Sequence, residues 1–249
     1  MDIEGDIDAA TVESVRNIFD ESHKKALRAR TTKCPEVKND FAAFGDHFGI
    51  NSRGGSVPAA MTIGRMFRRE QKHLQVGFPM TGNSGGPQNC ISACVLILAG
   101  TVDREIGDSA IIGIHRPYLS NTTLTTDQVM VVYADMLKDM RAYLREMNVS
   151  ERLATDMLAT EPESVHVLTR AELKNYGLAG LDPAEQQRRA IYNEARDVQE
   201  ANKLGLDRLE YTRRKFLGIN LCIYNSTTGK RMTDGEGFDC RRRVLMTGR

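Results

Sequence analysis

Two serine-containing segments of this chain could carry out nucleophilic hydrolysis. Residues 82–87, GNSGGP, place Ser84 in a G-x-S-x-G pattern, and residues 90–94, CISAC, place Ser92 among small side chains. A catalytic serine needs a base within hydrogen-bond reach, a group that orients this base, and two N–H donors for the oxyanion. The residues around each serine therefore decide which of them is the better candidate.

The surroundings of Ser84 do not meet these requirements. A nucleophile elbow needs a strand that runs directly into the serine and a helix directly after it, whereas Pro79 and Pro87 bracket this segment. The chymotrypsin-like order of histidine, aspartate and serine spans two β-barrels, and 83 residues before Ser84 are too few for that. We interpret residues 81–89 as a glycine-rich loop.

Ser92 is supported by the segments on either side of it. Upstream, residues 50–57 read INSRGGSV, a short apolar entry into a glycine-rich turn. Glycine at position 55 would let the backbone approach a substrate closely, because no Cβ intervenes. Downstream, residues 109–114 are a strand candidate that ends on His115, a residue type suited to general base catalysis.

Taken in order, these motifs resemble the proteolytic subunit of Clp protease and its exported relatives. That family has an Ile-Asn-Ser-Pro-Gly-Gly-Ser-Val-like turn, matched here with Arg53 at the proline position. Its nucleophile segment matches residues 91–94, and its Met-Ile-His-Gln-Pro-like strand end matches residues 113–117. A protruding handle helix and a closing segment match residues 126–147 and 168–178. The resemblance covers residues 1–180.

The resemblance implies a role for each of these residues. Ser92 Oγ would attack the scissile carbonyl, and His115 would take its proton and return it to the leaving amine. The backbone N–H groups of Gly55 and Ala93 would form the oxyanion hole. Counting back from the closing segment without gaps places the third triad member at Glu161. Asp156, Glu163, or no carboxylate at all, with a backbone carbonyl or water orienting His115, remain open alternatives.

The implied function is a serine-type endopeptidase that hydrolyses peptides or unfolded proteins and assembles as a homo-oligomer. An acyl-thioester enzyme of the crotonase type and a catalytically silent oligomeric scaffold of the same fold are the alternatives. No cofactor is expected, and without a Walker-type phosphate loop the chain is not expected to bind ATP by that route. No metal is expected, because the cysteines and histidines lack zinc spacing.

Strand and helix signals alternate up to about residue 180, which predicts an α/β fold. The resemblance makes this a Clp-protease/crotonase-like spiral of ββα units with a protruding handle helix. We expect a catalytic domain over residues 1–180 and a C-terminal extension over residues 181–249. Apolar periodicity predicts helices at about 11–29, 58–72, 91–99, 126–147 and 182–216, and a terminal β-hairpin around 227–229.

Composition excludes several other classes of protein. A net charge of +1 argues against a nucleic-acid-binding protein, and no apolar run approaches the roughly 20 residues that span a membrane. The resemblance and the five cysteines suggest an exported or periplasmic protein. A chain complete as given would instead be cytoplasmic, because it begins without a signal peptide. In an oxidising compartment Cys222 and Cys240 are the favoured disulfide, whereas Cys90 and Cys94 are either small buried residues or, if Cys90 lies before the helix, a second pair.

Overall fold

The computed structural model describes residues 2–31, 47–78, 88–119, 123–225 and 228–249. The chain divides into two compact units, Met1–Pro183 and Ala184–Arg249. The first unit contains Ser92, His115 and the strands that carry them. Over the described residues, we find no helix with the length and apolar character that crossing a membrane requires.

The larger sheet of the first unit has the strand order β1-β2-β3-β5-β8. Its first four strands are parallel, and β8 pairs with β5 in the antiparallel direction. Parallel strands that alternate with helices confirm the predicted α/β class. The strands are β1 (Asp2–Glu4), β2 (His47–Asn51), β3 (His73–Val76), β5 (Asp103–Ile106) and β8 (Gly180–Leu181).

A smaller sheet carries the two candidate catalytic residues at the ends of neighbouring strands. Strands β4 and β6 are parallel, with Ile91 opposite Gly113, and β7 is antiparallel to β6. Because parallel strands end at the same edge, the residues that follow β4 and β6 lie close together. The three strands are β4 (Asn89–Ile91), β6 (Ile111–Ile114) and β7 (His166–Val167).

A short bridge joins the two sheets directly beside Ser92. The N–H of Ser52, just after β2, donates to the Asn89 carbonyl oxygen at 2.8 Å. The N–H of Ile91 donates back to the Ser52 carbonyl oxygen at 3.0 Å. The glycine-rich turn that follows β2 is therefore fixed to the strand that leads into the serine.

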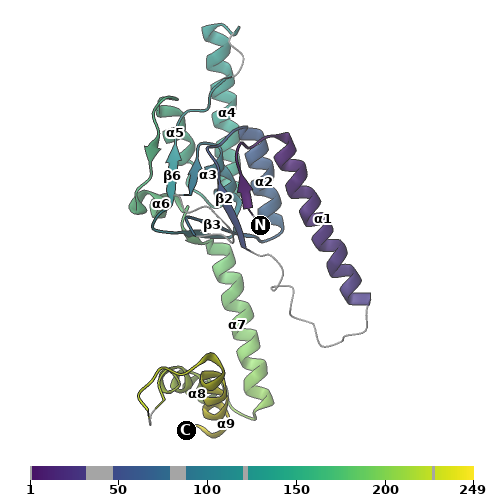
Figure 1. Cartoon of the computed structure of the whole chain (residues 1–249), viewed down its shortest axis with the longest axis vertical. Helices are drawn as coiled ribbons and strands as arrows, with labels where there is room; N and C mark the ends of the chain where they lie inside the picture. Colours follow the sequence, from purple (N-terminus) through teal and green to yellow (C-terminus); the bar gives the residue numbers. More distant parts are fainter. Residues whose placement is uncertain (1, 32–46, 79–87, 120–122, 226–227) are drawn as a thin grey trace. The chain divides into compact units, whose positions relative to one another are not determined.

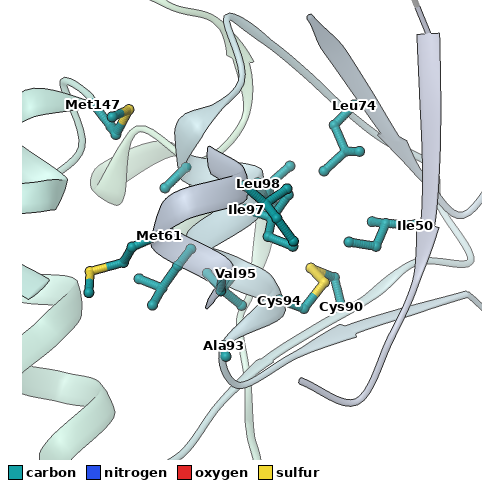
Figure 2. Packing of buried hydrophobic residues seen from close by; sticks show 14 of the residues in the cluster. Ile50, Met61, Leu74, Cys90, Ala93, Cys94, Val95, Ile97, Leu98 and Met147 are labelled. Atoms are coloured by element: carbon teal, nitrogen blue, oxygen red, sulfur yellow. A yellow bond between two sulfur atoms is a disulfide. The ribbon is translucent and has the colours of Figure 1, made fainter. Parts of the chain in front are cut away.

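The core of the first unit is built around the short helix α3, in which every residue is buried. Figure 2 shows Val95, Ile97 and Leu98 of α3 among Ile50 and Leu74 of the larger sheet. Helices α1 and α2 run side by side in Figure 1. The helices of this unit are α1 (Ala9–Thr31), α2 (Val57–Arg69), α3 (Cys94–Gly100), α4 (Thr126–Glu146), α5 (Arg152–Ala159) and α6 (Arg170–Tyr176).

Two glycines allow α2 and α3 to pack closely. A Cβ built on Gly100 would lie 2.4 Å from the Gly64 Cα, and one built on Gly64 would lie 1.8 Å from the Tyr143 Oη. That hydroxyl is buried and donates to the Leu96 carbonyl oxygen at 2.6 Å. A side chain at position 64 would therefore disturb the helix that follows Ser92 and the tyrosine that anchors it.

A buried ionic cluster fixes the C-terminal end of α3. Arg104 donates to the carbonyl oxygens of Leu98 and Ala99, at 3.2 Å and 2.7 Å. The Asp182 carboxylate is fully buried, 2.9 Å from an Arg68 nitrogen and 3.7 Å from an Arg104 nitrogen. Burial alone would raise the pKa of Asp182, but the hydrogen bond and charge of Arg68, together with the charge of Arg104, hold it below its usual range.

The first unit differs from the prediction in one helix boundary and two unpredicted features. Residues 89–91 form strand β4, so the helix expected from residue 91 begins only at Cys94. Helix α5 and the strand position of His47 were not predicted. The apolar stripe expected over residues 126–147 is buried in its C-terminal part, at Met140, Tyr143, Leu144 and Met147.

The second unit differs more from expectation. The predicted helix over 182–216 is two helices, α7 (Pro183–Lys203) and α8 (Arg208–Leu221), because Gly205 adopts a φ of 64° and Asp207 caps α8. The hairpin predicted around residues 227–229 lies partly outside the described residues; the described part of it contains a bridge between Tyr224 and Arg231, and α9 (Asp234–Thr247) follows. The Thr233 capping box that opens α9 was missed. The expected Cys222–Cys240 disulfide is present.

We predict that Gly64→Ala lowers the free energy of unfolding by about 1–3 kcal/mol, because the new methyl overlaps the Tyr143 hydroxyl. Urea denaturation of the Gly64→Ala, Tyr143→Phe and double variants measures this. The penalty of Gly64→Ala should be smaller in the Tyr143→Phe background, where the hydroxyl is gone. Equal penalties in both backgrounds would contradict this account of the helix contact.

We predict that Asp182→Asn destabilises the chain by about 3–5 kcal/mol, because it leaves the partly buried Arg68 and the buried Arg104 without a counter-charge. The lowered pKa of Asp182 means that its contribution is complete above the unfolded value of about 4 and is lost as pH falls through the folded value. Unfolding curves from pH 7 to pH 2 should therefore converge in acid. Glu146→Gln, which removes an exposed partner of Arg65, is the control and should change stability little.

Candidate active site

Ser92 lies in a two-residue turn between β4 and α3. Its N–H donates to the Gly113 carbonyl oxygen at 2.9 Å, which continues the pairing of β4 with β6. Helix α3 begins two residues later, at Cys94. A strand thus runs directly into the serine and a helix follows it, which is the local arrangement of a nucleophile elbow.

The backbone of Ser92 adopts a left-handed conformation, with φ of 58°. A residue with a Cβ is disfavoured there by about 1–2 kcal/mol. Ser92 is also 5% exposed, so the surrounding structure must enforce this conformation. Strained residues of this kind cluster at active sites, where the strain aims a side chain.

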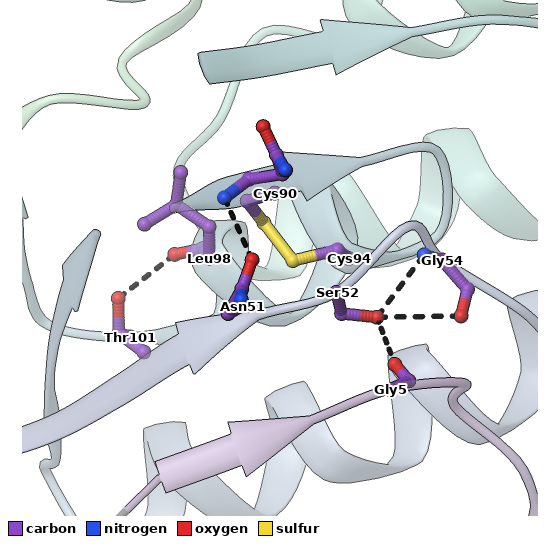
Figure 3. The surroundings of a disulfide bond; sticks show 9 residues. Gly5, Asn51, Ser52, Gly54, Cys90, Cys94, Leu98 and Thr101 are labelled. Carbon is purple, nitrogen blue, oxygen red and sulfur yellow. Dashed lines mark hydrogen bonds between the residues drawn. A yellow bond between two sulfur atoms is a disulfide. The ribbon is translucent and has the colours of Figure 1, made fainter. Parts of the chain in front are cut away.

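The glycine-rich turn lies against Ser92 and is itself held in place. Gly54 has φ of 110°, and a Cβ built on it would lie 2.7 Å from the Ser92 Cβ. The Ser52 hydroxyl donates to the Gly5 carbonyl oxygen at 2.5 Å and accepts from the Gly54 N–H at 3.1 Å (Figure 3). Position 54 therefore requires glycine for two reasons, its backbone conformation and its contact with the serine.

Two backbone N–H groups beside Ser92 have no hydrogen-bond acceptor among the described residues. They belong to Gly55 and to Ala93. A Cβ built on Gly54, the neighbour of Gly55, would lie 3.1 Å from the Ala93 nitrogen, so the two peptide segments are in close contact. Unpaired donors on either side of a serine are the chemical requirement of an oxyanion hole.

His115 follows β6 directly and is 8% exposed. Its Nδ1 lies 2.9 Å from the carbonyl oxygen of Arg116. Because a carbonyl oxygen can only accept, Nδ1 carries the hydrogen and Nε2 carries the lone pair that a general base uses. No hydrogen bond joins His115 to Ser92 within the described chain. Such contacts are often long in unliganded enzymes and tighten when substrate binds.

The segment after His115 is tied to two other parts of the first unit. The Arg116 N–H donates to the Thr160 carbonyl oxygen at 2.9 Å, and the Tyr118 hydroxyl donates to the Pro162 carbonyl oxygen at 2.7 Å. The Tyr133 hydroxyl of α4 donates to the Pro117 carbonyl oxygen at 2.9 Å. These bonds fix the carbonyl that orients the histidine ring.

The Glu161 carboxylate pairs with the guanidinium of Arg116, and its side chain is two-thirds exposed. The Asp156 carboxylate accepts from the Tyr176 hydroxyl at 2.6 Å and from Arg152 at 3.1 Å. Glu163 is exposed. Across the ranges that the structure describes, no carboxylate contacts the His115 ring, and its partner is the Arg116 carbonyl.

The remaining candidates for chemistry have other surroundings. His23 and His166 pair with Glu70 and Glu172, each at 2.8 Å. Hydrogen bonds from Thr169, with a smaller contribution from His166, lower the pKa of Glu172 to about 2. Ser84 lies outside the described residues. In the described ranges we find no cluster of three or more histidine, cysteine or acidic side chains that could hold a metal ion.

The feature that the sequence analysis left open is a disulfide between Cys90 and Cys94, whose Cα atoms are 5.2 Å apart. A separation of four residues on one helix would have been awkward for such a bond. The bond forms because Cys90 belongs to strand β4 and only Cys94 belongs to α3. The two cysteines thus enclose the turn that carries Ser92.

The chain was compared with known families, curated proteins and solved structures. No family model matches it, and no curated protein matches its sequence. Structural neighbours include two mutants of the membrane-bound stomatin-specific protease 1510-N, the second in complex with a substrate peptide. Their sequences are 15% and 14% identical to this chain, and each has a TM-score of 0.48. Each comparison covers 75% of this chain, and covers 81% of the first neighbour's chain and 76% of the second's. A Clp protease subunit from Listeria monocytogenes is 18% identical, with a TM-score of 0.44 over 72% of this chain and 87% of its own.

The first two of these neighbours are named as proteases. The roles considered for individual residues of this chain rest on the turn, the glycines and the histidine described above.

Proposed function

We propose that this chain is a serine peptidase in which Ser92 is the nucleophile and His115 the general base. The observation that carries the proposal is the left-handed Ser92 at a strand–turn–helix junction, beside two backbone N–H groups that have no acceptor in the part of the chain that the structure describes. A packing serine in a buried helix would need neither the strained conformation nor the unpaired donors. Both features are what an acyl-transfer site requires.

The proposed reaction starts with a peptide whose scissile carbonyl lies over Ser92. His115 Nε2 takes the Ser92 hydroxyl proton as the oxygen attacks, and the N–H groups of Gly55 and Ala93 stabilise the oxyanion. The tetrahedral intermediate collapses when the histidine gives the proton to the leaving amine, which leaves an acyl group on Ser92. Water, deprotonated by the same histidine, then attacks the acyl carbonyl; the bond to Ser92 Oγ breaks, and the histidine returns the proton to that oxygen.

The proposed role of the Arg116 carbonyl is to orient His115. In a serine triad, a carboxylate holds the imidazole in the correct tautomer and stabilises its charged form. The carbonyl, which accepts from Nδ1 at 2.9 Å, can supply the first of these effects without a charge. We therefore propose a serine–histidine dyad, and Glu161 acts through its ion pair with Arg116 rather than as a third catalytic residue.

The proposed substrates are peptides or unfolded proteins, and the proposed active form that hydrolyses them is a homo-oligomer of this chain. The partly exposed N-terminal half of α4, the handle helix of the resemblance, leaves Met130 and Val131 accessible to a second copy. Acyl-thioester hydrolysis and a silent scaffold remain as outcomes that the labelling experiment below distinguishes.

Fluorophosphonate labelling tests the proposed nucleophile and base. We expect wild-type protein to be labelled on Ser92, Ser92→Ala to be unlabelled, and His115→Ala to react about 10²- to 10⁴-fold more slowly. Ser84→Ala is the matched control, because it alters the competing serine, and it should keep the wild-type rate. Mass spectrometry of the labelled peptide identifies the modified residue.

Three outcomes would contradict the proposal. Labelling that persists in Ser92→Ala, or that is lost in Ser84→Ala, would assign the chemistry to another serine. Absence of labelling in the folded wild-type protein would favour the scaffold. Thioester turnover that survives Ser92→Ala would favour the crotonase-type enzyme.

The contact between Gly54 and Ser92 gives a second prediction. Gly54→Ala should slow labelling about 10²-fold, because its methyl would displace the serine. Gly5→Ala is the control: Gly5 also has a positive φ, of 83°, but a Cβ there would meet nothing within 4 Å. Both variants carry backbone strain, so a comparable loss of labelling in Gly5→Ala would show that strain, and not the contact with Ser92, is responsible.

A further inference from the structure

We propose that the Cys90–Cys94 disulfide is the positioning element that keeps Ser92 in its reactive conformation, so that labelling and hydrolysis at Ser92 require the oxidised form. This inference rests on the proposed function of Ser92. It concerns residues that do not touch the reacting atoms, and therefore assigns them a positioning role. The disulfide closes a five-residue loop, residues 90–94, with Ser92 at its centre.

The two sides of this loop are held differently by the rest of the chain. On the side of β4, the Ile91 N–H donates to Ser52 and the Ser92 N–H donates to Gly113. On the side of α3, the carbonyl oxygens of Ser92 and Ala93 accept from the N–H groups of Val95 and Leu96, at 3.1 Å and 3.0 Å, so the turn moves with the helix. The Ala93 N–H makes no hydrogen bond among the described residues. The bond from Cys94 to Cys90 is therefore a covalent tie between the start of the helix and the strand.

Because of the position of the disulfide, breaking it should displace Ser92. Cys90 and Cys94 are both fully buried, and Figure 2 shows their sulfur atoms between α3 and Ile50. Two thiols cannot remain at bonding distance, and a close-packed core has no free space to receive the displaced atoms. Reduction must therefore separate Cys90 from Cys94, and the residue between them with the least favourable backbone conformation is Ser92.

The Gly54 contact limits where the turn can move. The Ser92 Cβ lies against the Gly54 backbone on one side, and β4 is fixed by its pairing with β6 on the other. A shift of Cys94 and Ala93 then changes both the serine side chain and the Ala93 N–H, which is one of the proposed oxyanion donors. Loss of the bond should accordingly reduce the reaction of Ser92 without unfolding the larger sheet.

The redox step requires a dithiol as reductant. One thiolate of the reductant attacks a sulfur of the disulfide and displaces the other cysteine as a thiolate, which forms a mixed disulfide. The second thiolate of the reductant then displaces the remaining cysteine and closes a cyclic disulfide. Two electrons pass from the reductant to the protein, and the two cysteines take up two protons.

The experiment compares oxidised and reduced protein at equal fluorophosphonate concentration. Wild type is treated with dithiothreitol until alkylation and mass spectrometry show that Cys90 and Cys94 are thiols. We expect the labelling rate of Ser92 to fall at least about tenfold and to recover on reoxidation. The far-ultraviolet circular dichroism spectrum should stay unchanged, which separates loss of positioning from loss of the fold.

The second disulfide of the chain provides the matched control. Cys222→Ala/Cys240→Ala removes that bond, and this variant should be labelled at the wild-type rate and keep the full response to dithiothreitol. Cys90→Ala/Cys94→Ala should be labelled slowly with or without dithiothreitol. If this variant fails to fold, the reduction and reoxidation of wild type still give the result.

Hydrogen exchange gives a readout that does not depend on the hydrolase activity. The peptide that covers residues 89–96 should exchange faster after reduction, whereas peptides from β1 and β3 should not change. Labelling that is undiminished in fully reduced protein overturns the inference alone. Absence of labelling in oxidised protein overturns the proposed function, and with it the activity part of the inference. Unchanged exchange at residues 89–96 overturns the positioning role whatever the activity.

Discussion

The contact between Gly54 and Ser92 is the constraint on which the candidate site depends. It brings the turn after β2 against the turn after β4, and only a residue without Cβ can occupy it, since a Cβ would lie 2.7 Å from that of Ser92. The Ser52 hydroxyl and backbone secure the glycine side of this contact through Gly5 and β4. The left-handed backbone of Ser92 secures the other side. The segments that carry the N–H groups of Gly55 and Ala93 are in close contact as a result.

The rest of the first unit holds this contact in place through α3. The helix starts two residues after Ser92, and its direction is set by the close approach of Gly64 to Gly100 and by the Tyr143 hydroxyl. Its far end is fixed by Arg104, whose charge Asp182 balances. Burial lowers the pKa of Arg104 to about 10, with a further contribution from Arg68, but the group remains charged at neutral pH. A polar cluster remote from the serine therefore determines where the helix, and with it the turn, can lie.

The sequence was sufficient to predict the α/β class and to place His115 at the end of a strand, because the order of the motifs is a property of the chain itself. It was insufficient for the turn at Ser92, since residues 89–99 are uniformly apolar or small and short buried strands resemble buried helices. The break between α7 and α8 depended on single residues, Gly205 and Asp207, within an otherwise helical pattern. Glu161 came from counting residues, and a count does not determine the partner that a side chain chooses; here that partner is Arg116.

In the proposed mechanism, a carbonyl instead of a carboxylate orients His115, so other groups must stabilise the charges that develop in the transition state. A carboxylate partner stabilises the imidazolium that forms as the serine attacks, and a neutral carbonyl does so less. Arg116 and Glu161 form an ion pair whose charges largely cancel at the histidine. More of the transition-state stabilisation then rests on the N–H groups of Gly55 and Ala93, and such donors act only from well-defined positions. A site of this kind tolerates little movement of the turn that carries Ser92. The contact with Gly54 on one side and the Cys90–Cys94 bond on the other both restrict that movement.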